Sequence, residues 1–172
     1  MYGKSNQRRR FNTNSRNKTI EQDNSFRCNQ KNKSEGREIM KAISARVTRG
    51  LNLGAEMVAA DNSGAKIVRL VSVKRGKSTK GRQQYAKIAD WVKVSVRKGL
   101  PDMKGKVFDA VIVRQRRPYR RLNGERVAFE DNAVALLKDE KGNPKGTQIK
   151  GVVAREVMER WQSVAKIASS VY

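Results

Sequence analysis

Three runs rich in valine and isoleucine place the strongest constraint on what this chain can fold into. They are KIVRLVSVK, DWVKVSVRKG and KVFDAVIVRQ, at residues 66–74, 90–99 and 106–115. In the second run Val92, Val94 and Val96 alternate with polar residues, which is the period of a half-buried strand. The first and third runs are apolar on both sides, as expected for strands in a closed or covered sheet.

Shorter strand-like segments come after the three runs. They are ERVAFED and NAVALLKD, at residues 125–131 and 132–139. Turn-forming residues separate the segments, as DNSG at 61–64, NG at 123–124 and GNPKG at 142–146. Several short strands at this spacing, divided by turns, predict a mainly β fold built on a small barrel.

The C-terminal segment, residues 153–172, changes to a helical period. Its apolar residues recur at steps of three and four: Ala154, Val157, Met158, Trp161, Val164, Ala165 and Ala168. Such a stripe predicts a short helical part that packs on the barrel. The polar side of the same helix is then the better candidate for contact with another protein.

Residues 1–39 differ from residues 40–172, which read as the compact domain. Asparagine, serine, lysine and arginine dominate this N-terminal extension. So few apolar side chains cannot offset the ordering cost of roughly 1–2 kcal/mol per residue, so a basic extension of the disordered type is expected. A second interpretation is an arm that orders on RNA, because Arg8, Arg9 and Arg10 adjoin Phe11, which can stack on a base.

The charge balance indicates a polyanionic partner. The chain has 39 Lys and Arg against 16 Asp and Glu, a net charge of +23. There is no membrane-spanning apolar run of about 20 residues and no apolar signal-peptide core, so a cytoplasmic location is expected. One cysteine excludes an internal disulfide, and the lack of histidine removes the commonest general base and metal ligand. We therefore expect no enzyme, cofactor or metal site.

Two motifs invite chemical interpretations that their context does not support. GKSTKG, at 76–81, resembles the end of a P-loop, but Val71 stands where that motif needs glycine. The segment is better explained as a flexible basic loop that follows RNA phosphates through Lys74, Arg75, Lys77, Lys80 and Arg82. The carboxylates Asp61, Glu130 and Asp131 could form a metal cluster. However, Asp61 and Asp131 each precede an asparagine at a strand end, which favours a role in fixing turns.

The densest charge lies in RQRRPYRR, at residues 114–121. Its arginines are Arg114, Arg116, Arg117, Arg120 and Arg121. Like charges 4 Å apart repel by about 1 kcal/mol in water, so a folded arm this basic is better explained by phosphate contacts than by a solvated hairpin. Tyr119 could stack on a base or ribose, or pack back onto the barrel. Because phosphate contacts carry no sequence information, recognition of folded RNA shape is expected.

Three stretches together resemble a known family. GAEMVAADNSGAKIVRLVSVK, DAVIVRQRRPYRRLNGERVAFEDNAVAL and GNPKGTQIKGVVAREVMERW occur in order and with matching spacing. They resemble the universal large-subunit ribosomal protein family that is numbered fourteen in bacteria, in its archaeal and eukaryotic form. The resemblance runs from about Met40 to Tyr172.

The resemblance implies a five-stranded β-barrel with a protruding β-ribbon and a short C-terminal helical segment. It also implies binding to large-subunit rRNA, contact with neighbouring ribosomal proteins, bridges to small-subunit rRNA at the subunit interface, and docking of a factor that prevents premature subunit joining. The leading rRNA contacts are then the basic loop 74–82 and the arginine arm 114–121. A second set is Lys66, Arg69, Arg97 and Lys98, and the candidates for protein contacts are Glu156, Glu159 and Arg160.

A different class of protein remains as the alternative. A free nucleic-acid chaperone or chromatin-type protein with a small barrel would also be strongly basic. It would bind single strands through aromatic side chains spread over one face of the barrel. Trp91, Phe108 and Phe129 instead lie in segments that are predicted to be internal strands, which favours the ribosomal interpretation.

Overall fold

A computed structural model of the chain describes residues 41–74, 76 and 83–172. Backbone contacts divide the chain into two units, Met1–Ile39 and Met40–Tyr172. The elements of the second unit are β1 (Ala45–Arg46), β2 (Leu51–Asn52), β3 (Glu56–Ala59), β4 (Ala65–Val73), β5 (Tyr85–Ala86), β6 (Trp91–Gly99), β7 (Val107–Arg114), β8 (Tyr119–Arg121), β9 (Arg126–Val127), β10 (Ala133–Leu136), β11 (Ile149–Val153), α2 (Arg155–Arg160), α3 (Gln162–Ala165) and β12 (Ala168–Val171). No helix in the described ranges is long and apolar enough to cross a bilayer.

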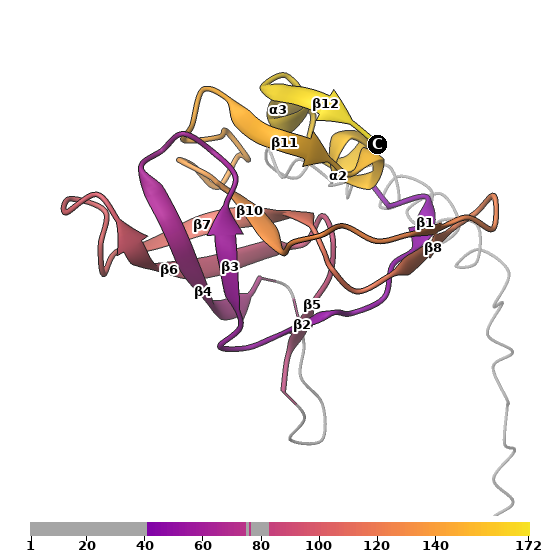
Figure 1. The fold of residues 1–172 in the computed structure, drawn as a ribbon, viewed down its shortest axis with the longest axis horizontal. Coiled ribbons are helices and arrows are strands. Elements are labelled where there is room, and N and C mark those ends of the chain that lie inside the picture. The colour runs from indigo at the N-terminus through magenta and orange to yellow at the C-terminus, as the bar shows by residue number, and fades with distance from the viewer. Residues whose placement is uncertain (1–40, 75, 77–82) are drawn as a thin grey trace, which may run out of the picture. The chain divides into compact units, whose positions relative to one another are not determined.

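Five of these strands close into a barrel in the order β10-β3-β4-β6-β7 (Figure 1). The pairs β3–β4, β4–β6, β6–β7 and β7–β10 are antiparallel, and the parallel pair β3–β10 closes the cylinder by placing Val58 opposite Ala133. The three long runs of the sequence form β4, β6 and β7. The prediction of a small five-stranded barrel is therefore confirmed, whereas the predicted N-terminal extension lies outside the described residues.

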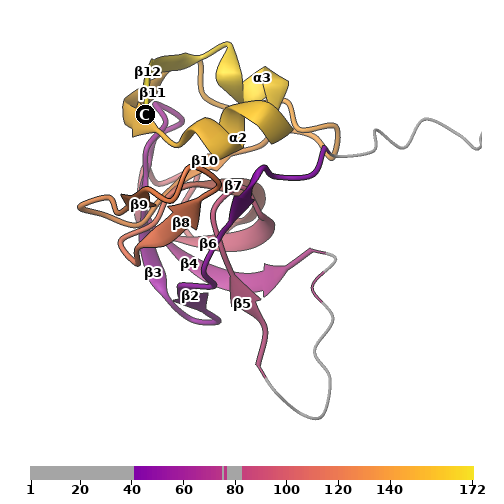
Figure 2. The same cartoon turned by 90° about the vertical axis from the view of Figure 1, so that its right-hand side faces the viewer.

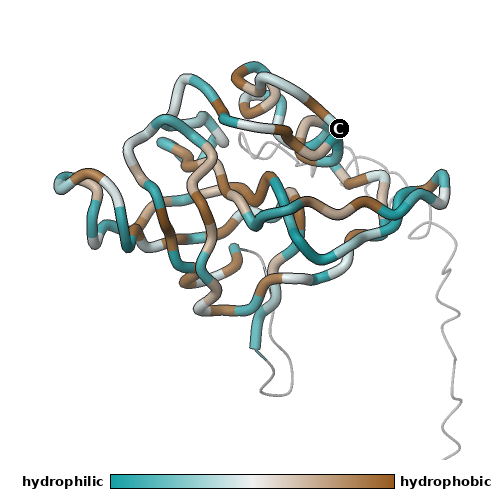
Figure 3. The backbone as a smooth tube through the Cα atoms, in the orientation of Figure 1, coloured by the Kyte–Doolittle hydropathy of each residue, from teal (hydrophilic) through white to brown (hydrophobic). Residues whose placement is uncertain are grey.

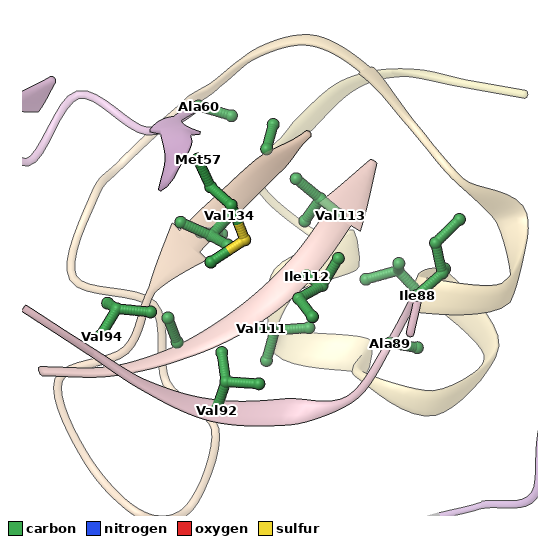
Figure 4. Packing of buried hydrophobic residues seen from close by; sticks show 14 of the residues in the cluster. Met57, Ala60, Ile88, Ala89, Val92, Val94, Val111, Ile112, Val113 and Val134 are labelled. Carbon is green, nitrogen blue, oxygen red and sulfur yellow. The ribbon is translucent and has the colours of Figure 1, made fainter. Parts of the chain in front are cut away.

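The interior of the barrel follows from the alternation in β6. Val92, Val94 and Val96 are at most 1% exposed, whereas Lys93 and Arg97 point to solvent. The register sets Val94 opposite Leu70 on one side and opposite Phe108 on the other. Figure 4 shows the resulting packing, with the Met57 side chain lying beside Val134. Apolar side chains buried in this way supply most of the stability of such a domain.

The C-terminal elements cover one side of the outer surface of the barrel. All of Ala110–Val113 in β7 and all of β10 are buried, and the C-terminal elements lie over β10 and β7 (Figures 1 and 2). On β4, by contrast, Val71 is 47% exposed. Both runs therefore lie in a closed sheet, as predicted, although β7 is buried on both faces and β4 leaves Val71 exposed on its outer face.

The C-terminal apolar stripe packs on the barrel as predicted, but it does not form one helix. Helix α2 ends at Arg160, α3 follows after Trp161, and Ala168 lies in β12, which pairs in parallel with β11. The Trp161 indole donates a hydrogen bond to the Ala89 carbonyl at 2.9 Å and meets Trp91 edge to face, with ring centroids 6.0 Å apart. Such aromatic pairs favour this T-shaped arrangement.

Three smaller sheets extend from the barrel. Strands β1, β8 and β9 form an antiparallel sheet in the order β1-β8-β9, β2 pairs with β5, and β11 pairs with β12. The β8–β9 hairpin is the predicted ribbon, with the NG turn at residues 123–124. In Figure 3 the barrel strands carry long hydrophobic stretches, whereas the tube through β8 is hydrophilic. The basic segment is therefore held in a sheet beside the barrel.

A pair of glycine substitutions isolates the contact between the 139–142 turn and Trp161. Gly142 has a φ of +87°, and a Cβ there would come within 2.7 Å of the Trp161 ring. Gly105 has a φ of +80°, and a Cβ added there would have no atom within 4 Å. We expect Gly105→Ala to cost about 1–2 kcal/mol from its backbone conformation alone. Gly142→Ala is expected to cost about 1–3 kcal/mol more, because the ring must also shift. Urea unfolding measures both, and equal losses would contradict the packing at Trp161.

Candidate nucleic-acid interface

The five arginines of the 114–121 segment divide into two groups. Arg114 and Arg121 have side chains only 12% and 13% exposed and are held in ion pairs. Arg116, Arg117 and Arg120 are exposed, and no carboxylate in the described part of the chain lies within 4.0 Å of them. The sequence predicted phosphate contacts from all five arginines, whereas the structure gives two of these side chains, Arg114 and Arg121, a role inside the fold.

Arg114 joins the end of β7 to two other segments. Its Nε and Nη2 donate to the two carboxylate oxygens of Asp131 at 2.7 and 3.0 Å, a bidentate pair. Its Nη1 donates to the backbone carbonyls of Lys150 and Val152, both at 3.0 Å. Planar guanidinium donors fit a carboxylate in this way more closely than a lysine can. Arg114 thereby ties β11 to the barrel.

Arg121 belongs to a buried cluster with Tyr119 and Glu156. Glu156 in α2 is 3% exposed; it accepts a hydrogen bond from the Tyr119 hydroxyl at 2.6 Å and one from Arg121 Nε at 2.9 Å. Burial and the nearby Glu156 carboxylate raise the pKa of Tyr119 well above its usual range. Burial alone would lower the pKa of Arg121, but the bond to Glu156 and its charge raise it. The cluster fastens β8 to α2.

Tyr119 therefore takes one of the two roles left open by the sequence. Its side chain is 1% exposed and packs inward, so it presents no face for stacking on a base. Arg121 also donates to the backbone carbonyl of Tyr172 at 2.8 Å, and its guanidinium lies over the Tyr172 ring. The prediction of Tyr119 and Arg121 as RNA contacts does not fit these positions, because their polar groups are already engaged within the fold.

Lys74 is the member of the predicted basic loop that the structure describes. Its Nζ lies 3.0 Å from Asp109, 2.9 Å from Glu140 and 3.9 Å from the centre of the Trp91 ring. Burial lowers the pKa of Lys74, and the hydrogen bonds to Glu140 and Asp109 more than compensate, so it is raised overall. Lys74 therefore anchors the loop to the barrel. Arg75, Lys77, Lys80 and Arg82 lie outside the described residues, and their RNA contacts stay predictions.

The second predicted set lies on the outer surface of the barrel. Lys66 and Arg69 on β4 and Arg97 and Lys98 on β6 are exposed. These strands are neighbours, and the register places Lys98 opposite Ile67, next to Lys66. The four cations thus share one two-strand surface, which can face a polyanion. They belong to the barrel sheet, separate from the sheet that holds Arg120.

Asp61 and Asp131 have structural roles, although not both as predicted, whereas Glu130 is exposed. Asp61 is 5% exposed, and it accepts hydrogen bonds from the Leu136 amide at 3.1 Å and from Ser63 at 3.0 Å. Burial raises its pKa, and these hydrogen bonds offset part of that rise. The turn-fixing role holds for Asp61, but Asp131 instead pairs with Arg114. Within the described ranges no three acidic or cysteine residues are grouped to hold a metal ion.

The three candidates for protein contacts are all engaged within the fold. The prediction of Glu156 on an exposed polar side is wrong, because β8 covers it. Glu159 bonds to Ser44 and pairs with Arg155 at 3.6 Å, and Arg160 pairs with Asp90 at 3.4 Å. The side chains of Glu159 and Arg160 are 24% and 20% exposed. The exposed residues on α2 and α3 and directly after α3 are Arg155, Gln162 and Lys166.

Two exposed arginines beside the arm were missed by sequence reasoning. Arg46 in β1 pairs in register with Arg120, and Arg126 in β9 pairs with Arg120 from the other side. Arg46 lies far from the cluster in sequence and Arg126 lies beyond the turn, so no local pattern groups them. Only the register of the three-stranded sheet brings them together.

Comparison with known proteins identifies the family of the chain. The family model described as ribosomal protein L14p/L23e matches residues 50–172, which include the whole barrel, the arginine arm and the C-terminal elements. The chain belongs to this family. A curated relative, the large ribosomal subunit protein uL14 of Nanoarchaeum equitans, is 57% identical over 129 residues, 75% of this chain and 97% of the relative. The protein of that name from Halorubrum lacusprofundi is 49% identical over 132 residues, 77% of this chain and 99% of the relative.

Family membership confirms the resemblance seen in the sequence. The relatives align over nearly their whole length with about three quarters of this chain, so the L14p/L23e fold corresponds to the barrel unit with its ribbon and C-terminal elements. The observed five-stranded barrel is the architecture that the resemblance implied. Which cations touch RNA is a separate matter, and it depends on the exposure and pairing of each side chain.

Proposed function

We propose that this protein is a structural constituent of the large ribosomal subunit and that it binds large-subunit rRNA. The family match over residues 50–172 carries the proposal, since the matching relatives are named as large ribosomal subunit proteins. The corresponding location is the ribosome in the cytoplasm. The protein catalyses no reaction in this role; its action is to position RNA and neutralise its charge.

The division of the arginine arm supplies a mechanism. Arg114 and Arg121, fixed by Asp131 and Glu156, hold the segment against the barrel and α2. The exposed Arg116, Arg117 and Arg120 then present guanidinium groups to RNA phosphates from a rigid base. Charge-assisted contacts of this kind are strong, and they fix the register and orientation of the partner. The basic loop that Lys74 anchors, with Arg75, Lys77, Lys80 and Arg82, and the exposed cations of β4 and β6 add further phosphate contacts.

The finer role concerns the subunit interface. We propose that the protein takes part in bridges to small-subunit rRNA and adjoins other large-subunit proteins. The exposed side of α2 and α3, with Arg155, Gln162 and Lys166, is the surface available for a protein neighbour or for a factor that prevents subunit joining. Glu159 and Arg160 border this surface with partial exposure. Glu156 contributes only through the fold, because it is buried.

A density-gradient profile of the tagged protein tests the proposal. Cell lysate is fractionated before and after a high-salt wash, and the protein is located by its tag. An integral constituent is expected to remain with large subunits and joined ribosomes after the wash. Release into the light fractions at modest salt would contradict the proposal and favour a free nucleic-acid chaperone. Trp91, Phe108 and Phe129 lie half-buried against the core, which disfavours that alternative.

The double variant Arg116→Ala/Arg117→Ala tests the arm without disturbing the fold. Both side chains are exposed and make no ion pair with the described residues, so stability is expected to stay within about 0.5 kcal/mol. Binding to protein-free large-subunit rRNA is expected to weaken about tenfold or more, because a charge-assisted hydrogen bond is worth about 1.5–3 kcal/mol. Filter binding measures the affinity and urea unfolding the stability. Unchanged affinity in the folded variant would remove the arm from the interface.

A further inference from the structure

The sheet beside the barrel aligns three arginines that are dispersed in the sequence. In the register of β1, β8 and β9, Arg46 lies opposite Arg120 and Arg120 lies opposite Arg126. Figure 1 shows β1 and β8 side by side. Directly opposed residues of antiparallel strands project from the same face of the sheet, and neighbouring strands are about 4.8 Å apart. We name Arg46, Arg120 and Arg126 the arginine row.

The two faces of this sheet differ sharply. All three residues of the arginine row are exposed. The next pair in register is Tyr119 and Val127, which are only 1% and 2% exposed. Tyr119 precedes Arg120 in β8, and Val127 follows Arg126 in β9. The alternation therefore sends one set of side chains into the core and the arginine row outward. Its orientation is fixed by the buried set.

The arginine row keeps its mutual repulsion. No carboxylate in residues 41–74, 76 and 83–172 lies within 4.0 Å of these three guanidinium groups, whereas the adjacent Arg121 has both Glu125 and Glu156. Like charges placed directly opposite on a sheet are destabilising. Acidic partners are thus present for Arg121, one position from Arg120, and absent from the arginine row in the described residues. This is the pattern expected of a surface whose charge is neutralised by a bound anion.

A groove runs along the row. It has a volume of about 400 Å³ and is lined by the arginine row together with Val47, Thr48, Pro118 and Tyr119. Its rim is cationic, and Val47 and Pro118 supply apolar surface inside it. A nucleotide presents the complementary groups, since its phosphate is an anion and its sugar and base have apolar surface. A simple acidic side chain would leave the apolar lining unused.

We infer that the arginine row and its groove form a binding site for consecutive phosphates of one rRNA strand, with a nucleoside seated in the groove. The inference rests on the proposed function and adds Arg46 and Arg126 to the RNA-binding surface. Each guanidinium can donate two parallel hydrogen bonds to one phosphate, a geometry that lysine cannot reproduce. The row thereby reads the spacing of a phosphate backbone.

The test compares three variants of the full-length protein with wild type. The row variant is Arg46→Gln/Arg120→Gln/Arg126→Gln. The fork variant, which removes the bidentate guanidinium groups and keeps the charges, is Arg46→Lys/Arg120→Lys/Arg126→Lys. The control variant is Lys104→Gln/Lys106→Gln/Lys138→Gln, which removes three exposed positive charges elsewhere on the domain. Affinity for protein-free large-subunit rRNA is measured from 50 to 200 mM salt, with polyglutamate as a second probe, and each variant is unfolded in urea.

The row variant is expected to lower the magnitude of the slope of log affinity against log salt by about 2, because three single-strand phosphate contacts contribute about 0.7 each. The row variant is also expected to be at least as stable as wild type, because removing the three positive charges relieves their mutual repulsion. The fork variant is expected to keep the slope and lose affinity, and the control variant to keep both.

Three outcomes would overturn the inference. The first is a wild-type slope and affinity in the row variant. The second is a row variant that loses polyglutamate binding while its rRNA binding is unchanged, which would assign the row to an acidic protein. The third is equal slope losses in the row and control variants, which would reduce the effect to net charge. Failure of wild type itself to bind rRNA would instead sink the proposed function, and the inference with it.

Discussion

Glu156→Ala is expected to lower the free energy of unfolding by about 3–5 kcal/mol, because removal of one partner from a buried ion pair leaves the other uncompensated. Glu156 is 3% exposed and holds both the Tyr119 hydroxyl and Arg121. The variant leaves the Arg121 guanidinium, 13% exposed, without its main acceptor and leaves the Tyr119 hydroxyl without a hydrogen-bond partner. Urea unfolding of the purified chain measures the loss.

The matched control for this prediction is Arg155→Ala in the same helix. Arg155 has a side chain 71% exposed and pairs with Glu159 at 3.6 Å. Exposed pairs of this kind contribute about 0.2–1 kcal/mol, so the control is expected to change stability little. Glu156→Ala with a stability as close to wild type as that of the control would show that the buried cluster does not fasten β8 to α2.

Arg114→Ala is expected to destabilise the protein by about 2–4 kcal/mol. Four charge-assisted hydrogen bonds disappear, two to Asp131 and two to the carbonyls of Lys150 and Val152. Each such bond contributes about 1.5–3 kcal/mol where its partner stays buried, although Asp131 regains water because its side chain is 38% exposed. The stability of Arg114→Lys is expected to fall between those of wild type and Arg114→Ala, since lysine keeps the charge and loses the bidentate hydrogen bonds.

Arg116→Ala is the control, two positions away in the same cluster. Its exposed side chain makes no ion pair with the described residues, so a change within about 0.5 kcal/mol is expected. The double variant Arg114→Ala/Asp131→Ala is expected to lose less than the sum of the single changes, as contacting partners do. Additive losses, or equal stability of the Arg114 and Arg116 variants, would place Arg114 with the RNA-facing arginines instead.

The barrel was predictable from the sequence because its signal is local. The alternation of Val92, Val94 and Val96 and the β-branched content of β4 and β7 are properties of neighbouring residues. The family motifs added the number of strands. The end of the helical stripe was not predictable in this way. Ala168 continues the helical period, but it pairs with Ile149 across the β11–β12 ladder, and this long-range pairing overrides a local preference.

The roles of the individual arginines could not be read from the cluster. Arg114 and Arg116 are the same residue type two positions apart, and they differ because Asp131 and two carbonyls of β11 meet only one of them. Glu156 follows a helical pattern that sends it outward, yet the β8 strand covers it. The arginine row depends on strand register, which joins residues on three separate segments.

The short strands β1 and β9 have a consequence for the protein before it meets RNA. Barrel closure leaves β3, β4, β6, β7 and β10 with no free edge, whereas β1 and β9 border their sheet. Exposed strand edges invite pairing with another chain, which leads to aggregation, and short edges that carry charge resist it. Each of these strands has two residues, one of which is an arginine, Arg46 or Arg126. The same charges that would bind RNA in the subunit thus keep newly made copies of the chain apart.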